Sequence, residues 1–248
     1  MTLLRRVVPD PVVIGDPSGG DAEAVRAVLA ELYAYPQPVP ERGWVRANMV
    51  ATLDGAASGP DGLSGSISGP ADRAVFTVLR GLADVIVVGA GTARAEGYRV
   101  PVAKPAFAAL RARLGQSPAP VLAVLSRTGS LPASLAAGTH VPDGEVLVLQ
   151  GDLHHAIAGL TGRGLRRILL EGGPQVLGQA LTAGLLDELC LSLSPVLVGG
   201  AGPRIISGAP ASARLRMAQL LEGDGMLLGR WLIERTSAES TSPSAPGM

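Results

Sequence analysis

The sequence of 248 residues predicts an α/β fold with a mostly parallel central sheet, helices on both faces and antiparallel C-terminal strands. Short apolar strands alternate with helices along most of the chain, which is typical of a parallel sheet covered on both faces. The segment 84–88 is a short apolar run of the kind found in fully buried strands. After residue 186, strand-like segments follow one another without a helix, which predicts antiparallel strands at the end of the sheet.

The N-terminal part is expected to contain one helix and one strand before a long loop. Residues 1–20 are rich in Pro and Gly, and we expect them to wrap the surface. Asp21 can cap a helix that runs to about Tyr35, where several prolines break it. The segment 44–51 predicts a strand. The Gly- and Ser-rich stretch 52–69 predicts a long loop, which at this length is usually functional or disordered.

Helices and strands then alternate along the chain. Ser68 is the expected N-cap of a helix from Pro70 to Leu82, because Ser is favoured at the cap and Pro suits the first turn. Asp152 is the expected cap of a helix to about Leu160. The remaining predicted elements are strands at 84–88, 121–125, 145–149, 167–170, 186–198, 213–220 and 226–233, and helices at 104–114 and 174–183.

The chain is expected to form one main folded domain. Residues 1–40 are predicted to be an N-terminal extension with one helix, and residues 41–235 the domain itself. The Ser- and Pro-rich residues 236–248 predict a disordered tail. A chain of this length can bury a full core.

Composition excludes several classes of function. The 21 basic residues balance the 21 acidic ones, so no net charge attracts nucleic acid or an anionic membrane. Cys190 is the only cysteine, which excludes an internal disulfide and a multi-cysteine metal site. Neither a signal peptide nor a transmembrane stretch is found, so we expect a cytoplasmic protein. We also expect no bound metal, because the chain has one cysteine and its three histidines include no metal-ligand pair at helical spacing.

The most informative segment is Glu171-Gly172-Gly173-Pro174, which lies between a predicted strand and a predicted helix. Pro is favoured at the first helical position, and glycines let a ligand approach the backbone. The N–H groups and the dipole at such a helix start attract anions. The segment predicts a phosphate site with the carboxylate of Glu171 beside it, although an ordinary strand–helix turn has the same pattern.

Two further loops follow predicted strands. Open α/β sheets bind ligands at the carboxyl ends of their strands, so the loops 52–68 and 89–97 are expected beside the phosphate site. Together the three loops predict a pocket for a polar, phosphorylated molecule. The polar side chains that these two loops contribute are Thr52, Asp54, Ser64, Ser66, Ser68, Thr92, Arg94, Glu96 and Arg99.

Most other chemistries do not fit the sequence. A dinucleotide-binding fingerprint fails at Arg94, where a third glycine or alanine belongs. The pair Ser126-Arg127 after the strand 121–125 suits an adenosine 2′-phosphate, but is equally consistent with a solvated arginine. Since we find no hydrolase elbow, metal-ligand pair or P-loop, hydride transfer from a nicotinamide remains.

Four segments occur in a specific order along the chain, namely Asn48–Gly55, Ile67–Asp72, Val88–Glu96 and Glu171–Pro174. In this order and spacing they resemble the reductase domain of bacterial riboflavin biosynthesis. The resemblance implies a dihydrofolate-reductase-like fold and a reductase domain over residues 41–235. It also implies NADPH-dependent reduction of 5-amino-6-(5-phosphoribosylamino)uracil, with the hydride going to C1′ of the ribosyl group.

The resemblance further implies roles for individual residues. Asp54 and Glu171 are implied as catalytic carboxylates. Cofactor binding is implied for Val50, Thr52, Ser66, Gly89, Thr92, Glu96, Ser126, Arg127, Gly172, Gly173, Gln175, Val176 and Leu177. Substrate binding is implied for Asn48, Asp54, Ser64, Arg80, Arg94, Arg99 and Glu171.

Two departures from the family pattern matter. The first 40 residues are too few for the zinc deaminase that precedes the reductase in the bifunctional bacterial enzyme, so a monofunctional reductase is implied. The segment Glu96-Gly97-Tyr98-Arg99 replaces an Asp-Asp-Pro sequence and a later phosphate-binding Arg of that enzyme. Arg94 or Arg99 would have to take over the contact to the substrate phosphate.

Two alternative functions remain open from the sequence. A dihydrofolate reductase or another pteridine reductase would share the fold and the cofactor. A module that binds NADPH without catalysis would share only the cofactor. The apolar strands 186–198 and 226–233, together with the dimers typical of the family, predict a homodimer that contacts neither nucleic acid nor membrane.

Overall fold

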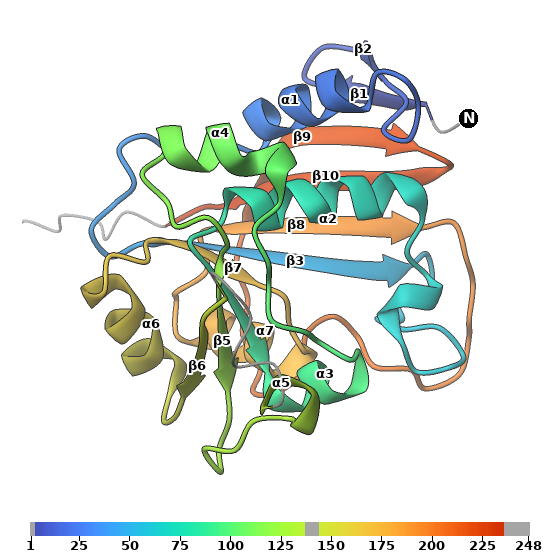
Figure 1. The fold of residues 1–248 in the computed structure, drawn as a ribbon. Coiled ribbons are helices and arrows are strands. Elements are labelled where there is room, and N and C mark those ends of the chain that lie inside the picture. Colours follow the sequence, from blue (N-terminus) through green and yellow to red (C-terminus); the bar gives the residue numbers. More distant parts are fainter. Residues whose placement is uncertain (1–2, 137–143, 236–248) are drawn as a thin grey trace, which may run out of the picture.

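The computed structural model describes residues 3–136 and 144–235, which form one mixed sheet flanked by helices (Figure 1). The ten strands of this sheet lie in the order β2-β1-β9-β10-β8-β3-β7-β4-β5-β6. They are β1 Leu4–Val8, β2 Val12–Gly15, β3 Trp44–Thr52, β4 Val85–Gly89, β5 Val121–Leu125, β6 Val146–Leu149, β7 Arg167–Leu170, β8 Glu188–Ser194, β9 Leu215–Gly223 and β10 Met226–Ile233. The helices are α1 Ala22–Leu32, α2 Pro70–Leu82, α3 Ala90–Ala95, α4 Pro105–Arg113, α5 Ala133–Ala136, α6 Leu153–Gly162 and α7 Pro174–Thr182, with a 3₁₀ turn η1 at Ser64–Ser66.

The strands from β8 to β6 run parallel to one another, which confirms the predicted parallel sheet. The residues 85–88 of β4 are fully buried, as expected for a strand covered on both faces. Because β3, β7 and β4 are neighbours in this order, their carboxyl ends meet at one edge of the sheet. The segments 52–68, 89–97 and 171–178, which follow these three strands, therefore lie at this edge.

The strands β10, β9, β1 and β2 continue the sheet in antiparallel pairs. Antiparallel pairing is confirmed for β9 and β10. For the segment 186–198 the prediction of an antiparallel edge was wrong, because β8 lies inside the sheet and pairs in parallel with β3. Only the side of β8 that faces β10 is antiparallel.

The N-terminal segment contains more regular structure than the sequence predicts. Helix α1 is confirmed, but β1 and β2 form a hairpin that joins the sheet through β9. The expectation that residues 1–20 only wrap the surface was therefore wrong. Five- and four-residue strands with many exposed positions carry too little apolar periodicity to be recognised. The domain boundary at residue 40 stays a prediction, and the predicted tail 236–248 lies outside the described residues.

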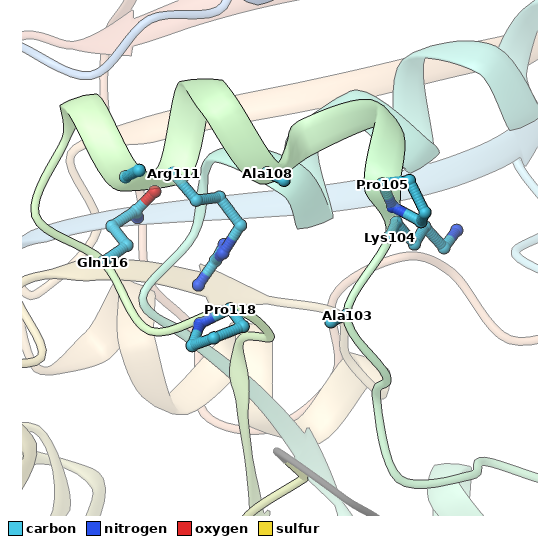
Figure 2. Close-up of a pocket in the computed structure, with 8 residues that line it drawn as sticks. Ala103, Lys104, Pro105, Ala108, Arg111, Gln116 and Pro118 are labelled. Carbon is cyan, nitrogen blue, oxygen red and sulfur yellow. The ribbon is translucent and has the colours of Figure 1, made fainter.

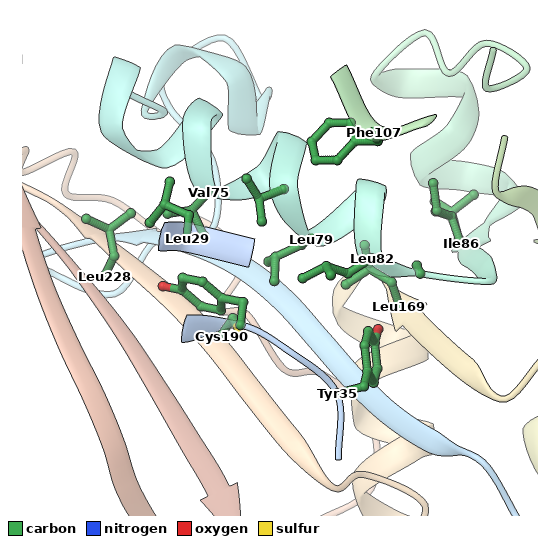
Figure 3. Packing of buried hydrophobic residues seen from close by; sticks show 14 of the residues in the cluster. Leu29, Tyr35, Val75, Leu79, Leu82, Ile86, Phe107, Leu169, Cys190 and Leu228 are labelled. Atoms are coloured by element: carbon green, nitrogen blue, oxygen red, sulfur yellow. The ribbon is translucent and has the colours of Figure 1, made fainter. Parts of the chain in front are cut away.

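Two hydrophobic cores lie on opposite faces of the sheet. One packs α1, α2 and α4 on the sheet and includes Leu29, Leu79 and Phe107 (Figure 3). The other packs α6 and α7 and includes Ile157 and Leu177. Helices on both faces are thus confirmed. None of the helices in the described ranges combines the length and apolarity that crossing a membrane requires.

Strand β8 buries its polar side chains and leaves its leucines half-buried. Glu188 and Ser192 are buried, while the leucines between them are only partly covered. The polar side chains find partners there, because Arg46 pairs with Glu188 and Asp72 accepts a hydrogen bond from Ser192. Partners of this kind offset the cost of burying polar groups.

The predicted helix caps are confirmed in part. Asp152 caps α6 by accepting a hydrogen bond from the backbone N–H of His155 at 2.9 Å. Asp21 precedes α1 without a side-chain cap hydrogen bond. Ser68 is not the cap of α2, because Gly69 takes that position and the Ser68 hydroxyl donates to Asp72 instead.

Candidate active site

A cleft of about 910 Å³ lies at the carboxyl ends of β3, β7 and β4 and along one face of α2. The three segments predicted to lie together meet here, because neighbouring parallel strands end at the same edge of the sheet. The prediction of a loop at 89–97 was wrong, because residues 90–95 form helix α3. Several predicted site residues line this cleft. They are Asn48, Val50, Ser64, Arg80, Thr92, Glu96, Arg99, Glu171 and Gly173.

The other predicted site residues are not part of the cleft lining. Val176 and Leu177 lie on the buried face of α7, and Gln175 is exposed. Ser126 is buried at the end of β5, and Arg127 beside it is exposed. The roles predicted for these residues stay predictions. The full set outside the lining is Thr52, Asp54, Ser66, Gly89, Arg94, Ser126, Arg127, Gly172, Gln175, Val176 and Leu177.

The carboxylate of Glu171 is fixed by two side chains of the cleft. Arg80 donates from Nε to Oε1 at 2.7 Å and from Nη2 to Oε2 at 2.6 Å. The Tyr98 hydroxyl donates to Oε2 at 2.8 Å. Burial and the charge of Glu171 raise the pKa of Tyr98, so its hydroxyl stays protonated and remains a donor. Burial alone would lower the pKa of Arg80, but its hydrogen bonds to Glu171 and the charge of Glu171 outweigh burial and raise it.

Asp54 organises the loop that follows β3. Its carboxylate accepts hydrogen bonds from the Thr52 hydroxyl and from the backbone N–H groups of Val198 and Gly199, the last at 2.6 Å. These hydrogen bonds lower the pKa of the exposed Asp54 carboxyl, the one from Thr52 most strongly. They also tie this loop to the segment after β8. The catalytic role predicted for Asp54 stays a prediction.

Glu96 connects two walls of the cleft. Its carboxylate accepts a hydrogen bond from the backbone N–H of Ser64 at 2.8 Å. Glu96 follows α3, whereas Ser64 begins η1 in the long loop after β3. The long loop predicted from its composition is therefore fastened to the α3 side of the cleft.

The Gly172-Gly173 turn brings the start of α7 to the cleft. Gly172 has φ +92°, a region that favours glycine, and its carbonyl accepts a hydrogen bond from the Gly89 N–H at 2.8 Å. A Cβ added at Gly173 would collide with the Thr92 hydroxyl. Gly173 and Pro174 line the cleft, so the N-terminus of α7 opens into it as an anion site requires.

The NADPH site predicted from the sequence has a testable consequence at Gly173. Replacing Gly173 with alanine should weaken NADPH binding roughly tenfold or more, because the new methyl group displaces Thr92. A fluorescence titration with NADPH measures the effect. Gly159→Ala in α6 is the matched control, since nothing lies within 4 Å of a Cβ added there. Unchanged NADPH affinity in a folded Gly173→Ala variant would contradict the anion site.

Among the cleft-lining residues that were not assigned to the site from the sequence are Asp72, Phe76, Tyr98 and Lys104. Asp72 and Phe76 precede Arg80 on α2 at intervals of four residues, which places all three on one face of the helix. This spacing is readable in the predicted helix once Arg80 is assigned to the site. Tyr98 and Lys104 lie between α3 and α4, where the sequence offers no periodic pattern.

A second, smaller cavity of about 430 Å³ lies beneath α4 (Figure 2). The buried guanidinium of Arg111 donates there to the carbonyls of Gly81 at 3.0 Å, Ala83 at 2.8 Å and Ser117 at 2.7 Å. Two of these carbonyls belong to the C-terminal end of α2 and lack helical partners. Arg111 thereby fastens α4 to α2, and the cavity belongs to this packing rather than to the cleft.

The chain is similar in sequence to two archaeal reductases. A 2,5-diamino-6-ribosylamino-4(3H)-pyrimidinone 5′-phosphate reductase from Methanothermobacter thermautotrophicus is 30% identical over 186 residues, which cover 66% of this chain and 83% of that protein. A protein of the same name from Archaeoglobus fulgidus is 24% identical over 203 residues, which cover 72% of this chain and 93% of that protein.

Solved structures share the fold. A pyrimidine reductase-like protein from Corynebacterium diphtheriae superposes with a TM-score of 0.70 and 26% identity over 84% of this chain and 98% of that one. RibD from Acinetobacter baumannii superposes with a TM-score of 0.65 and 19% identity over 79% of this chain and 59% of that one. These likenesses confirm the predicted dihydrofolate-reductase-like fold. The RibD C-terminal domain is matched over residues 43–228, and the chain therefore belongs to the RibD C-terminal domain family.

Proposed function

We propose that this protein is a reductase of riboflavin biosynthesis, which uses NADPH to convert the ribosylamino group of a phosphorylated pyrimidine into a ribitylamino group. The observation that carries this proposal is the cleft in which the fixed carboxylate of Glu171 lies beside the start of α7. The archaeal relatives are named as reductases of such a pyrimidine. They match over most of their length, which supports an enzyme that works without a deaminase domain.

NADPH fits the side of the cleft formed by α3 and α7. Gly173 leaves open the space that a Cβ would fill, and the N–H groups at the start of α7 suit a pyrophosphate. Thr92 and Glu96 line the same side, and Ser126 and Arg127 would hold the adenosine end. When bound, the cofactor supplies the hydride for C1′ of the ribosyl group.

The protein's own side chains bind and orient the substrate. Glu171 accepts two hydrogen bonds on Oε2 and one on Oε1, so one acceptor position remains on Oε1 for a ribosyl hydroxyl group. The substrate phosphate would be bound by the basic side chains at the rim. Of the two arginines predicted for this contact, Arg99 lines the cleft and Arg94 does not, and Lys104 adds a second cation.

Replacing Arg127 with alanine is expected to lower the preference for NADPH over NADH about tenfold or more. The reason is that hydrogen bonds between charged groups are strong, and the variant loses those from Arg127 to the 2′-phosphate of NADPH. NADH has no 2′-phosphate, so its binding should not change. Steady-state KM values for the two cofactors measure the effect, with Arg113→Ala on the exposed side of α4 as the control. Equal losses with NADPH and NADH would show that Arg127 does not contact the 2′-phosphate.

The first test of the function is NADPH oxidation with phosphoribosylaminopyrimidines and, in parallel, with dihydrofolate. Turnover of a pyrimidine alone is the expected result. Turnover of dihydrofolate alone would support the alternative of a pteridine reductase. NADPH binding without turnover of either substrate would support the alternative of a non-catalytic binding module and overturn the proposed reaction.

We also propose that the protein forms a homodimer, as predicted from its apolar strands. Leu189, Leu191 and Leu193 of β8 are half-buried, and β10 places Trp231 and Leu227 beside them. A second copy of the chain would cover this apolar face. The cytoplasmic location expected from the sequence stays a prediction.

A further inference from the structure

Asp72 is a buried carboxylate in the wall of the cleft that no basic side chain neutralises. It lines the cleft and only 6% of its surface is exposed. Asp72 takes part in none of the ion pairs formed within residues 3–136 and 144–235. A buried carboxylate without a positively charged partner costs free energy unless hydrogen-bond donors replace its lost hydration. Such a group is stabilised when a ligand brings hydrogen-bond donors to it.

Two hydroxyl groups hold the Asp72 carboxylate in place. Ser192 of β8 donates to Oδ1 at 2.6 Å, and Ser68 donates to Oδ2 at 2.5 Å. Each carboxylate oxygen has two lone pairs, so one acceptor position remains on each oxygen. The first turn of α2 adds a favourable helix dipole. The carboxylate is therefore oriented and can accept from two neighbouring N–H groups at once.

The face of α2 around Asp72 is suited to a flat heterocycle. Phe76 lies one helical turn further along and also lines the cleft, which provides an aromatic ring for packing. The Arg80 guanidinium covers the Phe76 ring at 4.3 Å and continues to Glu171. A ring bound at Asp72 would thus point its substituent along α2 toward the fixed carboxylate of Glu171.

The two candidate substrates, a 2-aminopyrimidinone and a uracil, present different edges to a carboxylate. The compound in the name of the archaeal relatives carries a 2-amino group next to N3–H, and these are two adjacent donors. The uracil expected from the sequence has an oxo group at position 2 instead. A carboxylate binds the first edge with two hydrogen bonds, whereas the second edge turns a carbonyl oxygen toward its negative charge.

We propose that Asp72 selects a 2-aminopyrimidin-4-one over the corresponding 2-oxo pyrimidine in this cleft. The inference rests on the proposed function and narrows its substrate class. Ser68 and Ser192 are positioning residues in this assignment, because they act through the Asp72 carboxylate.

A purely structural role for Asp72 leads to a different expectation. Its hydrogen bond from Ser192 ties α2 to β8, and this tie alone would affect every substrate equally. Asp72→Asn keeps the size of the side chain and one acceptor but removes the charge and adds a donor. The ratio of the kcat/KM values for the two substrates separates the two roles, because it does not depend on how much enzyme is folded.

The test measures kcat/KM of the wild type and of Asp72→Asn with NADPH and each of the two pyrimidine phosphates. The wild type is expected to prefer the 2-amino substrate by about 10- to 100-fold, the range for a hydrogen bond to a charged group. Asp72→Asn is expected to remove most of this preference, mainly by raising KM for the 2-amino substrate. Asp152→Asn at the cap of α6 is the control, since Asn caps helices as well as Asp.

The outcomes distinguish this inference from the proposed function. A wild type without preference, or an Asp72→Asn variant that loses activity equally with both pyrimidines, would overturn the selection by Asp72 and leave the reductase function intact. No turnover of either pyrimidine by the wild type would overturn the proposed function, and the inference with it.

Discussion

Replacing Glu188 with alanine is expected to lower the free energy of unfolding by about 3–5 kcal/mol, because it leaves buried positive charge without a partner. The side chains of Glu188 and Arg46 are both fully buried, with Oε1 and Nε 2.7 Å apart. Arg230 approaches the same carboxylate from β10 at 2.8 Å. For a chain of this size the midpoint of thermal unfolding should fall by roughly 6–20 °C.

Differential scanning calorimetry measures this loss. Glu222→Ala is the matched control, because Glu222 pairs with Arg5, whose side chain is 60% exposed. An exposed pair of this kind contributes less than about 1 kcal/mol. Similar losses in the two variants would show that the buried cluster gives no special stability.

The acid dependence of stability provides an independent check on Glu188. Burial alone would raise the pKa of Glu188, but Arg46 and Arg230 outweigh burial and lower it. A lowered pKa in the folded state means that the contribution is complete above the ordinary pKa of Glu, about 4.3, and is lost as the pH falls below it. The difference in stability between the wild type and Glu188→Ala should therefore shrink in acid.

Replacing Glu171 with glutamine is expected to lower kcat by about tenfold or more, a barrier increase on the order of 1.4 kcal/mol. Glutamine keeps the shape of the side chain but loses the charge that Arg80 binds with two hydrogen bonds. The side chain proposed to orient a ribosyl hydroxyl group is then no longer fixed. NADPH affinity should persist, because the start of α7 is unchanged.

Single-turnover kinetics and an NADPH titration together measure the effect of Glu171→Gln. Arg80→Lys should reproduce the loss in kcat, because lysine cannot form the bidentate pair. An equal loss of NADPH affinity and turnover in Glu171→Gln would instead identify Glu171 as a structural residue of the turn.

Much of the fold could be predicted because apolar strands and amphipathic helices alternate clearly in the sequence. The parallel strands β4, β5 and β7 are short, largely apolar and bounded by turn residues, which is a strong signal. The place of β8 could not be predicted from alternation alone. Its buried face carries Glu188 and Ser192, and only their tertiary partners make that face an interior one.

The cleft could be predicted in outline because strand topology places the segments 52–68, 89–97 and 171–178 together, although residues 90–95 are helical. The hydrogen-bond partners of the individual side chains could not be predicted from the sequence. Glu171 is paired with Arg80 across 91 positions of chain, a contact that no local pattern encodes. Asp72 was read only as part of a motif, because an acidic residue in the first turn of a helix ordinarily needs no further explanation.

Helix α2 fixes the separation of two groups in the cleft. Asp72 and Arg80 are eight residues apart on one rigid helix, so their Cα atoms are separated by about 12 Å along its axis. The distance between Asp72, proposed to bind the pyrimidine ring, and Arg80, which pairs with Glu171, is therefore set by the pitch of the helix and not by loop conformation. A change in the length or composition of the loops around the cleft would leave this spacing unchanged. The distance that a substrate must span between its ring and its ribosyl group would then stay the same.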